Sequence, residues 1–122
     1  MPPNDQTRTR FAKQPLTPPK GGDGDVDRLI SAVIVNFNAG EFLTVAVESL
    51  LAGEVRPMEI IVVDNASTDD SIARLQAAVD DPRLIVRHAG SNLGFAGACN
   101  VGIRMSRGAA ILLFNPGPDR GT

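Results

Sequence analysis

Residues able to bind a ligand follow each of four short apolar runs in this sequence. Asp64 and Asn65 come directly after the run 60–63. A carboxylate there could accept hydrogen bonds from a ribose hydroxyl or a base N–H, and the amide can both donate and accept. Gly94 and Gly97 follow the third run and would let a ligand or another backbone approach closely. Asn, Asp and Ser also cap helices and turns, and that alternative stays open for each loop.

The four apolar, β-branched runs are predicted to be strands of a parallel sheet, because near-continuous apolar runs are typical of strands buried on both faces. They cover residues 29–35, 58–63, 83–87 and 109–114. Segments between them place apolar residues at helical spacing, over 41–52, 67–79 and 94–107. Ser67 and Asp70 give the second segment a start like a capping box. The order β-α-β-α-β-α-β predicts an α/β fold with right-handed crossovers.

The exits of the predicted strands are expected to meet at one edge of the sheet, where ligands bind in open α/β folds. These exits carry amides, a carboxylate and glycines, whereas the connections at the opposite edge, such as 53–57 and 80–82, lack this combination of residue types. We therefore expect Asn38, Asp64, Asn92 and Asn115 to gather along that edge.

The helix beginning near Phe95 would point free N–H groups at this edge, and such a terminus suits a phosphate. Tight packing of small residues against the sheet is an equal alternative for Gly97 and Ala98. Asn100 lies about one turn into the helix and faces either the ligand or a neighbouring loop. Cys99 is predicted to be a small core residue, because no histidine stands in a useful relation to it.

Composition excludes several classes of protein. The 122 residues carry a net charge of −2, without the basic excess of a nucleic-acid binder. No apolar run approaches the ~20 residues of a membrane span, and no signal-peptide pattern is visible, so we expect a cytoplasmic protein. The single cysteine excludes an internal disulfide, and with only one histidine beside it a zinc site is not expected. Neither a dinucleotide fingerprint nor a P-loop is present.

The first 27 residues differ from the rest, with five of the nine prolines and few apolar side chains. Such a stretch cannot offset its ordering entropy by burial, so 1–27 is predicted to be a disordered leader. A docking motif around Pro15 to Pro19 is the alternative.

Three motifs resemble those of the inverting family 2 glycosyltransferases, and their closest likeness is to the bacterial rhamnosyltransferase-like branch. The motifs cover 33–38, 60–69 and 92–103, and the resemblance spans about 30–115. It implies a GT-A/Rossmann-like fold, a nucleotide-diphosphate sugar donor, and transfer with inversion to a hydroxyl of a glycan or lipid-linked acceptor. Residues 28–122 would then be the nucleotide-sugar-binding half of a truncated domain, cytoplasmic or peripheral at the inner face of the membrane.

By motif position, the resemblance places Asn36 and Phe37 beside the base and ribose of the donor, and has Asp64 and Asn65 contact the base or ribose. An Asn as the second member of that pair is similar to the rhamnosyl branch and favours a thymine-bearing donor. The remaining donor-binding residues are predicted to be Asn38, Ser67, Asn92, Gly94, Gly97, Asn100 and Asn115.

The family uses a divalent cation, Mg²⁺ or Mn²⁺, to neutralise charge on the leaving diphosphate, and relatives hold it with an Asn-Pro-Asp motif. Here Gly117 follows Asn115 and Pro116, so Asp119 becomes the candidate metal ligand. The acceptor-binding half and the expected catalytic base are missing, so we expect an incomplete, inactive fragment whose uncharged run 111–114 forms an aggregation-prone edge. The alternatives are a non-catalytic nucleotide-binding module and a flavodoxin- or receiver-like domain. The latter is disfavoured because the only lysines are in the leader.

Overall fold

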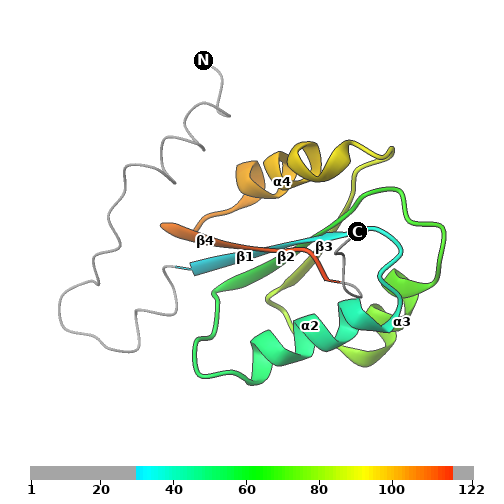
Figure 1. Cartoon of the computed structure of the whole chain (residues 1–122). Helices are drawn as coiled ribbons and strands as arrows, with labels where there is room; N and C mark the ends of the chain where they lie inside the picture. Colours follow the sequence, from blue (N-terminus) through cyan, green and yellow to red (C-terminus); the bar gives the residue numbers. More distant parts are fainter. Residues whose placement is uncertain (1–29, 117–122) are drawn as a thin grey trace, which may run out of the picture.

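Four parallel strands form the sheet that the apolar runs predict (Figure 1). The computed structural model describes residues 30–116, so the predicted leader 1–27 lies outside the described residues. The strands are β1 (Ile30–Asn36), β2 (Glu59–Asp64), β3 (Leu84–His88) and β4 (Ala110–Phe114). Their order across the sheet is β3-β2-β1-β4, which places the first two strands of the chain at the centre.

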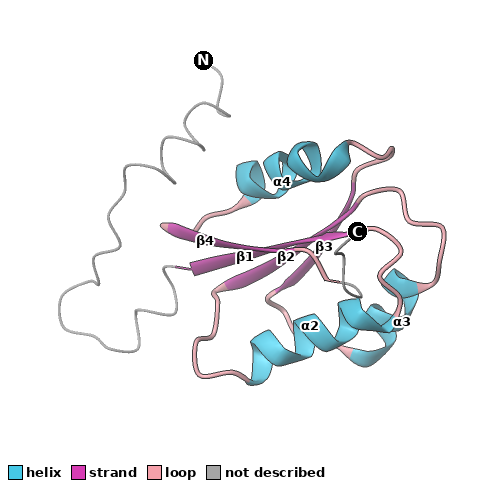
Figure 2. Cartoon of the chain, viewed as in Figure 1, coloured by secondary structure: helices cyan, strands magenta, loops and turns pink. Residues whose placement is uncertain are grey.

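Helices cover both faces of this sheet (Figure 2). The helices α2 (Glu41–Ala52) and α3 (Ser71–Ala78) pack on one face, and α4 (Gly94–Met105) packs on the other. The element order confirms the predicted β-α-β-α-β-α-β sequence. Among residues 30–116, no helix is long and apolar enough to cross a membrane.

The two central strands explain why their sequences are almost continuously apolar. Successive side chains of a strand point to opposite faces, and here both faces are buried. One set packs against α2 and α3, and it comprises Ala32, Ile34, Ile60 and Val62. The alternate set packs against α4, and it comprises Val33, Val35, Ile61 and Val63.

Helix α4 packs against the sheet at a glycine that leaves no room for a side chain. A Cβ on Gly102 would lie 2.4 Å from Val33 Cγ1, which no real side chain allows. Ala98 is fully buried on the same side, which confirms the packing alternative for that residue. A Cβ on Gly97 would instead meet Leu93 Cβ at 2.8 Å, so this glycine packs against the loop before the helix rather than against the sheet.

Two predicted helix boundaries are wrong. Helix α3 begins at Ser71, not at 67, and neither Ser67 nor Asp70 caps it as a capping box would. Ser67 Oγ instead accepts a hydrogen bond from the backbone N–H of Asn38 (2.9 Å), because the loop after β1 lies beside it. Helix α4 ends at Met105, since the backbone becomes extended at Ser106.

The opposite, amino-terminal edge of the sheet contains a buried carboxylate that sequence reasoning missed. Glu59 is 1% exposed. It accepts hydrogen bonds from Ser31 Oγ (2.6 Å) and from the backbone N–H (2.6 Å) and Nε (3.1 Å) of Arg107. The backbone N–H of Gly108 donates to Ser31 Oγ (2.8 Å). This network holds the connection from α4 to β4 against β1 and β2.

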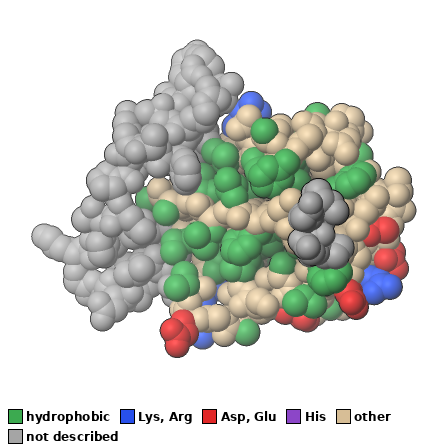
Figure 3. All heavy atoms as spheres, in the orientation of Figure 1, with side chains coloured by type: hydrophobic (Ala, Val, Ile, Leu, Met, Phe, Trp, Pro, Cys, Tyr) green, Lys and Arg blue, Asp and Glu red, His purple; other side chains and the backbone are tan. Residues whose placement is uncertain are grey.

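Strand β4 is an edge strand of the described sheet, and it is apolar on both faces. Leu112 and Leu113 point to opposite faces of the strand and are 39% and 43% exposed. Figure 3 shows hydrophobic side chains above and below the backbone of this edge. The observation agrees with the expected uncharged edge.

Candidate functional site

The carboxyl ends of the strands finish at the same level of the sheet. Asn36 pairs with Asp64, and Asp64 pairs with His88, across three neighbouring strands. The backbone N–H of Asn65 then donates to the carbonyl of Asn36 (2.8 Å), and that of Ala89 donates to the carbonyl of Asp64 (2.9 Å). The polar loops that follow therefore leave from one edge, as the sequence predicts (Figure 1).

A cavity of about 330 Å³ opens at this edge, on the side of α4. Several predicted donor-binding residues line it together with residues that the sequence analysis did not single out. The predicted ones are Phe37, Asn65, Asn92, Gly94 and Asn115, and the others are Val35, Phe95 and Pro116. A signal for Phe95 was available in the sequence, because the helix predicted to begin near this residue starts at the edge.

Asn65 shapes the cavity by holding the loop between β3 and α4. Its Nδ2 donates to Asn92 Oδ1 (3.1 Å) and to the carbonyl oxygen of Gly94 (3.3 Å). Its Oδ1 accepts from the backbone N–H of Leu93 (2.8 Å). Gly94 has φ +75°, a conformation that favours glycine, and its N–H donates to Asn92 Oδ1 (2.8 Å). Both ends of the Asn65 amide are used, and its side chain is almost fully buried.

Asn36 and Asp64 lie on the other side of the sheet and bind each other. Asn36 is fully buried, and its Nδ2 lies 2.9 Å from Asp64 Oδ1, 3.1 Å from Ser67 Oγ and 2.8 Å from Ser71 Oγ. Its Oδ1 accepts from the backbone N–H of Ala39 (3.3 Å). The backbone N–H of Ser67 donates to Asp64 Oδ2 (3.3 Å). These contacts fix the edge, and direct ligand contact by Asn36 and Asp64 stays a prediction.

Asn38 joins the loop after β1 to the loop after β2. Its Oδ1 accepts from the backbone N–H groups of Thr68 (2.8 Å) and Asp69 (3.2 Å), and its own N–H donates to Ser67 Oγ (2.9 Å). The backbone φ angles of Asn38 and Ala66 are +53° and +66°, values that residues other than glycine rarely adopt. The two loops therefore form one clamped unit beside the cavity.

Asp69 is the residue that completes this clamp and the start of α3. Its Oδ1 accepts from the backbone N–H (3.1 Å) and the hydroxyl (2.5 Å) of Ser71, and its Oδ2 accepts from the backbone N–H of Gly40 (3.0 Å). Burial by itself would raise the pKa of Asp69, but these hydrogen bonds outweigh it and hold the pKa below the ordinary value of 3.8.

The predicted site is thus divided between two faces because strand residues alternate in direction. Asn36 and Asp64 follow the residues that face α2 and α3, whereas Val35 and Asn65 face α4. Because side chains alternate in direction along a strand, the sequence alone could have shown which of these residues share a face. Gly97 and Asn100 do not line the cavity.

Two potentially reactive side chains lie outside the cavity lining, and Cys99 among them is in the core as predicted. Cys99 is buried in the core beneath α4, and burial raises the pKa of its thiol. His88 ends β3, with Nδ1 3.6 Å from Asp64 Oδ2.

The lining of the edge cavity does not fit a divalent cation. Mg²⁺ and Mn²⁺ are hard ions that take carboxylate oxygens, and the cavity lining contains amides but no carboxylate. Within residues 30–116, no group of three or more His, Cys, Asp or Glu side chains could hold a metal ion. The candidate ligand Asp119 lies outside the described residues.

Fold and edge together define an α/β domain with a cavity at the carboxyl ends of a parallel sheet, which is the place where ligands bind in open α/β folds. The profile of the family described as Glycosyl transferase family 2 matches residues 31–116. The chain belongs to this family. The rhamnosyltransferase-like branch is not tested by this match and stays a prediction.

Curated relatives agree with the family. The chain is 36% identical over 86 residues to "Succinoglycan biosynthesis protein ExoO" of Rhizobium meliloti (strain 1021), covering 70% of this chain and 24% of that protein. It is 36% identical over 91 residues to "Glycosyltransferase GlyG" of Streptococcus pneumoniae serotype 4, covering 74% and 30%. A third relative, the Escherichia coli "UDP-Glc:alpha-D-GlcNAc-diphosphoundecaprenol beta-1,3-glucosyltransferase WfaP", is 31% identical over 87 residues, covering 71% and 34%.

A solved structure shows the same fold, which is GT-A-like. It is the "Mannosyltransferase PcManGT from Pyrobaculum calidifontis in complex with GDP-Man and Mn2+", with a TM-score of 0.58 and 20% identity over 85% of this chain and 31% of that chain. The chain thus spans about a quarter to a third of the length of these proteins.

Proposed function

We propose that this chain supplies the donor-binding part of a glycosyltransferase and that its edge cavity holds the nucleoside of a nucleotide-diphosphate sugar. The observation that carries the proposal is the cavity itself, which brings two exposed aromatic side chains and several amides to the carboxyl edge of the sheet. The mannosyltransferase of the same fold was solved with a donor of this chemical class.

The size and the lining of the cavity suit a nucleoside rather than a whole nucleotide sugar. Its volume of about 330 Å³ is near the lower end for small-molecule sites, roughly 300–1,000 Å³. Phe37 and Phe95 are 50% and 47% exposed and offer flat faces on which a base can stack. The Asn115 side chain is exposed and has no hydrogen-bond partner among residues 30–116, so its amide is free to read the base edge.

The diphosphate would extend towards the start of α4. The first backbone N–H groups of a helix have no acceptor within the helix and lie at the positive end of its dipole. At Gly94 this N–H is already bound by Asn92, but Phe95 and Ala96 follow in the same turn. Asn65 acts here as a positioning residue, because it holds the loop that leads into the helix.

Residues beyond the described part would complete the enzyme. A divalent cation needs carboxylates that the cavity lining does not provide, so we expect residues 30–116 to bind the nucleotide without one. The acceptor, a glycan or a lipid-linked sugar, would contact other parts of a longer protein, in a cytoplasmic setting.

A non-catalytic nucleotide-binding module is the second candidate, and the absence of a carboxylate from the cavity lining favours it. Calorimetry with and without Mg²⁺ distinguishes the two functions. Nucleotide binding that is independent of the metal is expected of both candidates, and a sugar donor that stays intact with and without Mg²⁺ supports the module. Hydrolysis of the donor that depends on the metal supports the glycosyltransferase.

The cavity itself is tested by titrating the chain with UDP, GDP and dTDP. Phe37→Ala should weaken nucleotide binding by about tenfold, because a stacked base contributes roughly 1–3 kcal/mol. Phe42→Ala is the matched control, since Phe42 is 42% exposed on α2 and does not line the cavity. Equal losses in the two variants, or no binding of any nucleotide by the folded chain, would refute the proposal.

A further inference from the structure

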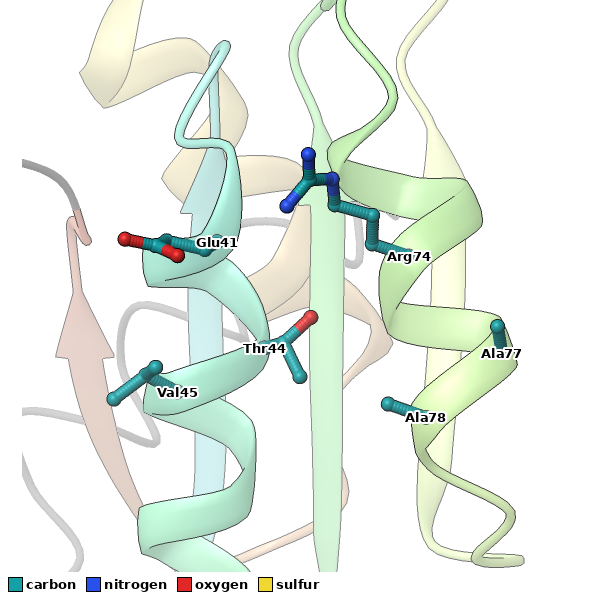
Figure 4. A pocket seen from close by; sticks show the side chains of 6 residues that line it. All are labelled: Glu41, Thr44, Val45, Arg74, Ala77 and Ala78. Atoms are coloured by element: carbon teal, nitrogen blue, oxygen red, sulfur yellow. The ribbon is translucent and has the colours of Figure 1, made fainter.

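A second hollow surface lies away from the edge cavity, along the groove between α2 and α3. One hollow of about 430 Å³ is lined by Glu41, Thr44, Val45, Arg74, Ala77 and Ala78 (Figure 4). Another of about 310 Å³ is lined by Glu48, Leu51, Ala52, Ala78, Val79, Asp80 and Asp81. Because Ala78 belongs to both, the two hollows form one groove that follows the helices.

The floor of the first hollow, of about 430 Å³, is largely apolar. In Figure 4, Thr44 and Ala78 point toward one another from the two helices. Val45 also lines this hollow and is 55% exposed. Thr44 Oγ1 is buried and has no hydrogen-bond partner among the described residues. A rotation about its χ1 would let it bind the main chain of a segment lying in the groove.

The rim of the groove is acidic. Glu41, Glu48 and Asp80 form no ion pair with another described residue, whereas Asp81 is paired with Arg83 (3.0 Å). The basic side chain in the lining, Arg74, is already bound by Asp70 Oδ1 (2.9 Å). The groove therefore favours an occupant that is basic and partly apolar.

We propose that residues 8–20 of this chain occupy the α2–α3 groove. Between residues 6 and 22 the sequence has four basic residues (Arg8, Arg10, Lys13 and Lys20) and no acidic ones. Phe11 and Leu16 lie among them and match the apolar floor. The charges of the segment complement the three rim carboxylates that form no ion pair within residues 30–116.

The geometry of the fold brings the segment to the groove. Helix α2 runs back from the carboxyl edge, so its last residue, Ala52, lies at the same end of the sheet as Ile30, where β1 begins (Figure 1). The groove is about 18 Å long, because α2 has 12 residues at roughly 1.5 Å each. The nine residues from 21 to 29 can extend over about 30 Å, so residues 8–20 can reach the groove from Ile30.

A photo-crosslink in the whole chain tests this proposal, which is independent of the nucleotide site. Benzoylphenylalanine replaces Phe11, labelled and unlabelled chains are mixed, and the linked peptides are identified by mass spectrometry. We expect links within one chain to residues of α2 and α3 that line the groove. Links spread over other surfaces, or links that join labelled to unlabelled chains, would overturn the proposal.

Charge reversal on the rim provides the matched comparison. Glu48→Lys combined with Asp80→Lys should lower the yield of the link by about fivefold, as expected for the loss of two exposed ion pairs. Glu54→Lys reverses an exposed acid that does not line either hollow and should leave the yield unchanged. Circular dichroism establishes that each variant is folded. Equal yields in the folded rim variant and the unsubstituted chain would contradict the proposed occupant.

Discussion

Replacing Asn65 with aspartate should destabilise the chain in a pH-dependent way. The Asn65 amide donates two hydrogen bonds, to Asn92 Oδ1 (3.1 Å) and to the carbonyl of Gly94 (3.3 Å). In Asn65→Asp a carboxylate oxygen would face these two acceptors in a nearly buried position. Each lost hydrogen bond costs about 1 kcal/mol, and the buried charge beside two oxygens adds to this, so we expect a loss of about 2–4 kcal/mol at pH 7.

The pH dependence has a definite sign. Burial beside acceptor oxygens disfavours the ionised form, so the introduced carboxyl has a folded-state pKa above its unfolded value. The variant is therefore most stable below the unfolded value, and it loses stability as the pH rises through the folded pKa. Asn65→Ala is the control, since it removes the same hydrogen bonds without adding a titratable group.

Thermal unfolding followed by circular dichroism at pH 5 and pH 8 measures both effects. A loss of 2–4 kcal/mol corresponds to a fall in Tm of roughly 10–25 °C for a domain of this size. We expect the Tm of Asn65→Asp, relative to the unsubstituted chain, to be lower at pH 8 than at pH 5. The Tm deficit of Asn65→Ala should be equal at the two pH values. A pH-independent deficit in Asn65→Asp would refute the role assigned to this amide.

Three further predictions concern packing, acid stability and self-association. Gly102→Ala should destabilise by about 1–3 kcal/mol in urea unfolding despite alanine's higher helix propensity, because its Cβ would lie 2.4 Å from Val33 Cγ1; an increase in stability would contradict the close packing of α4. The lowered pKa of Asp69 contributes stability that is present above pH 3.8 and lost as the pH falls through the folded value, so Asp69→Asn should flatten the acid limb of the stability profile. Leu113→Lys on the edge strand should reduce self-association in sedimentation, whereas Val45→Lys, equally a surface change, should not; a monomeric unsubstituted chain would contradict this expectation.

The sequence predicted the secondary structure well around the strands whose two faces are both buried. The runs around Val33 and Val62 are apolar on both faces, and this pattern has few solutions other than a central parallel strand. It failed at the start of α3, where Ser67 and Asp70 had the spacing of a cap. The competing partner of Ser67 is Asn38, about thirty residues away in the sequence, and local spacing carries no information about it.

The apolar runs alternate with segments of helical spacing, and this alternation determined the α/β order. The polar residues that follow each run determined the edge at which candidate ligand-binding groups collect. Only the tertiary structure decided how that edge is divided: Asn65 and Asn115 line the cavity beside α4, while Asn36 and Asp64 bind each other on the opposite face. The physical reason is that burial along a strand is set by its own side chains, whereas a hydrogen bond between loops depends on which strands become neighbours.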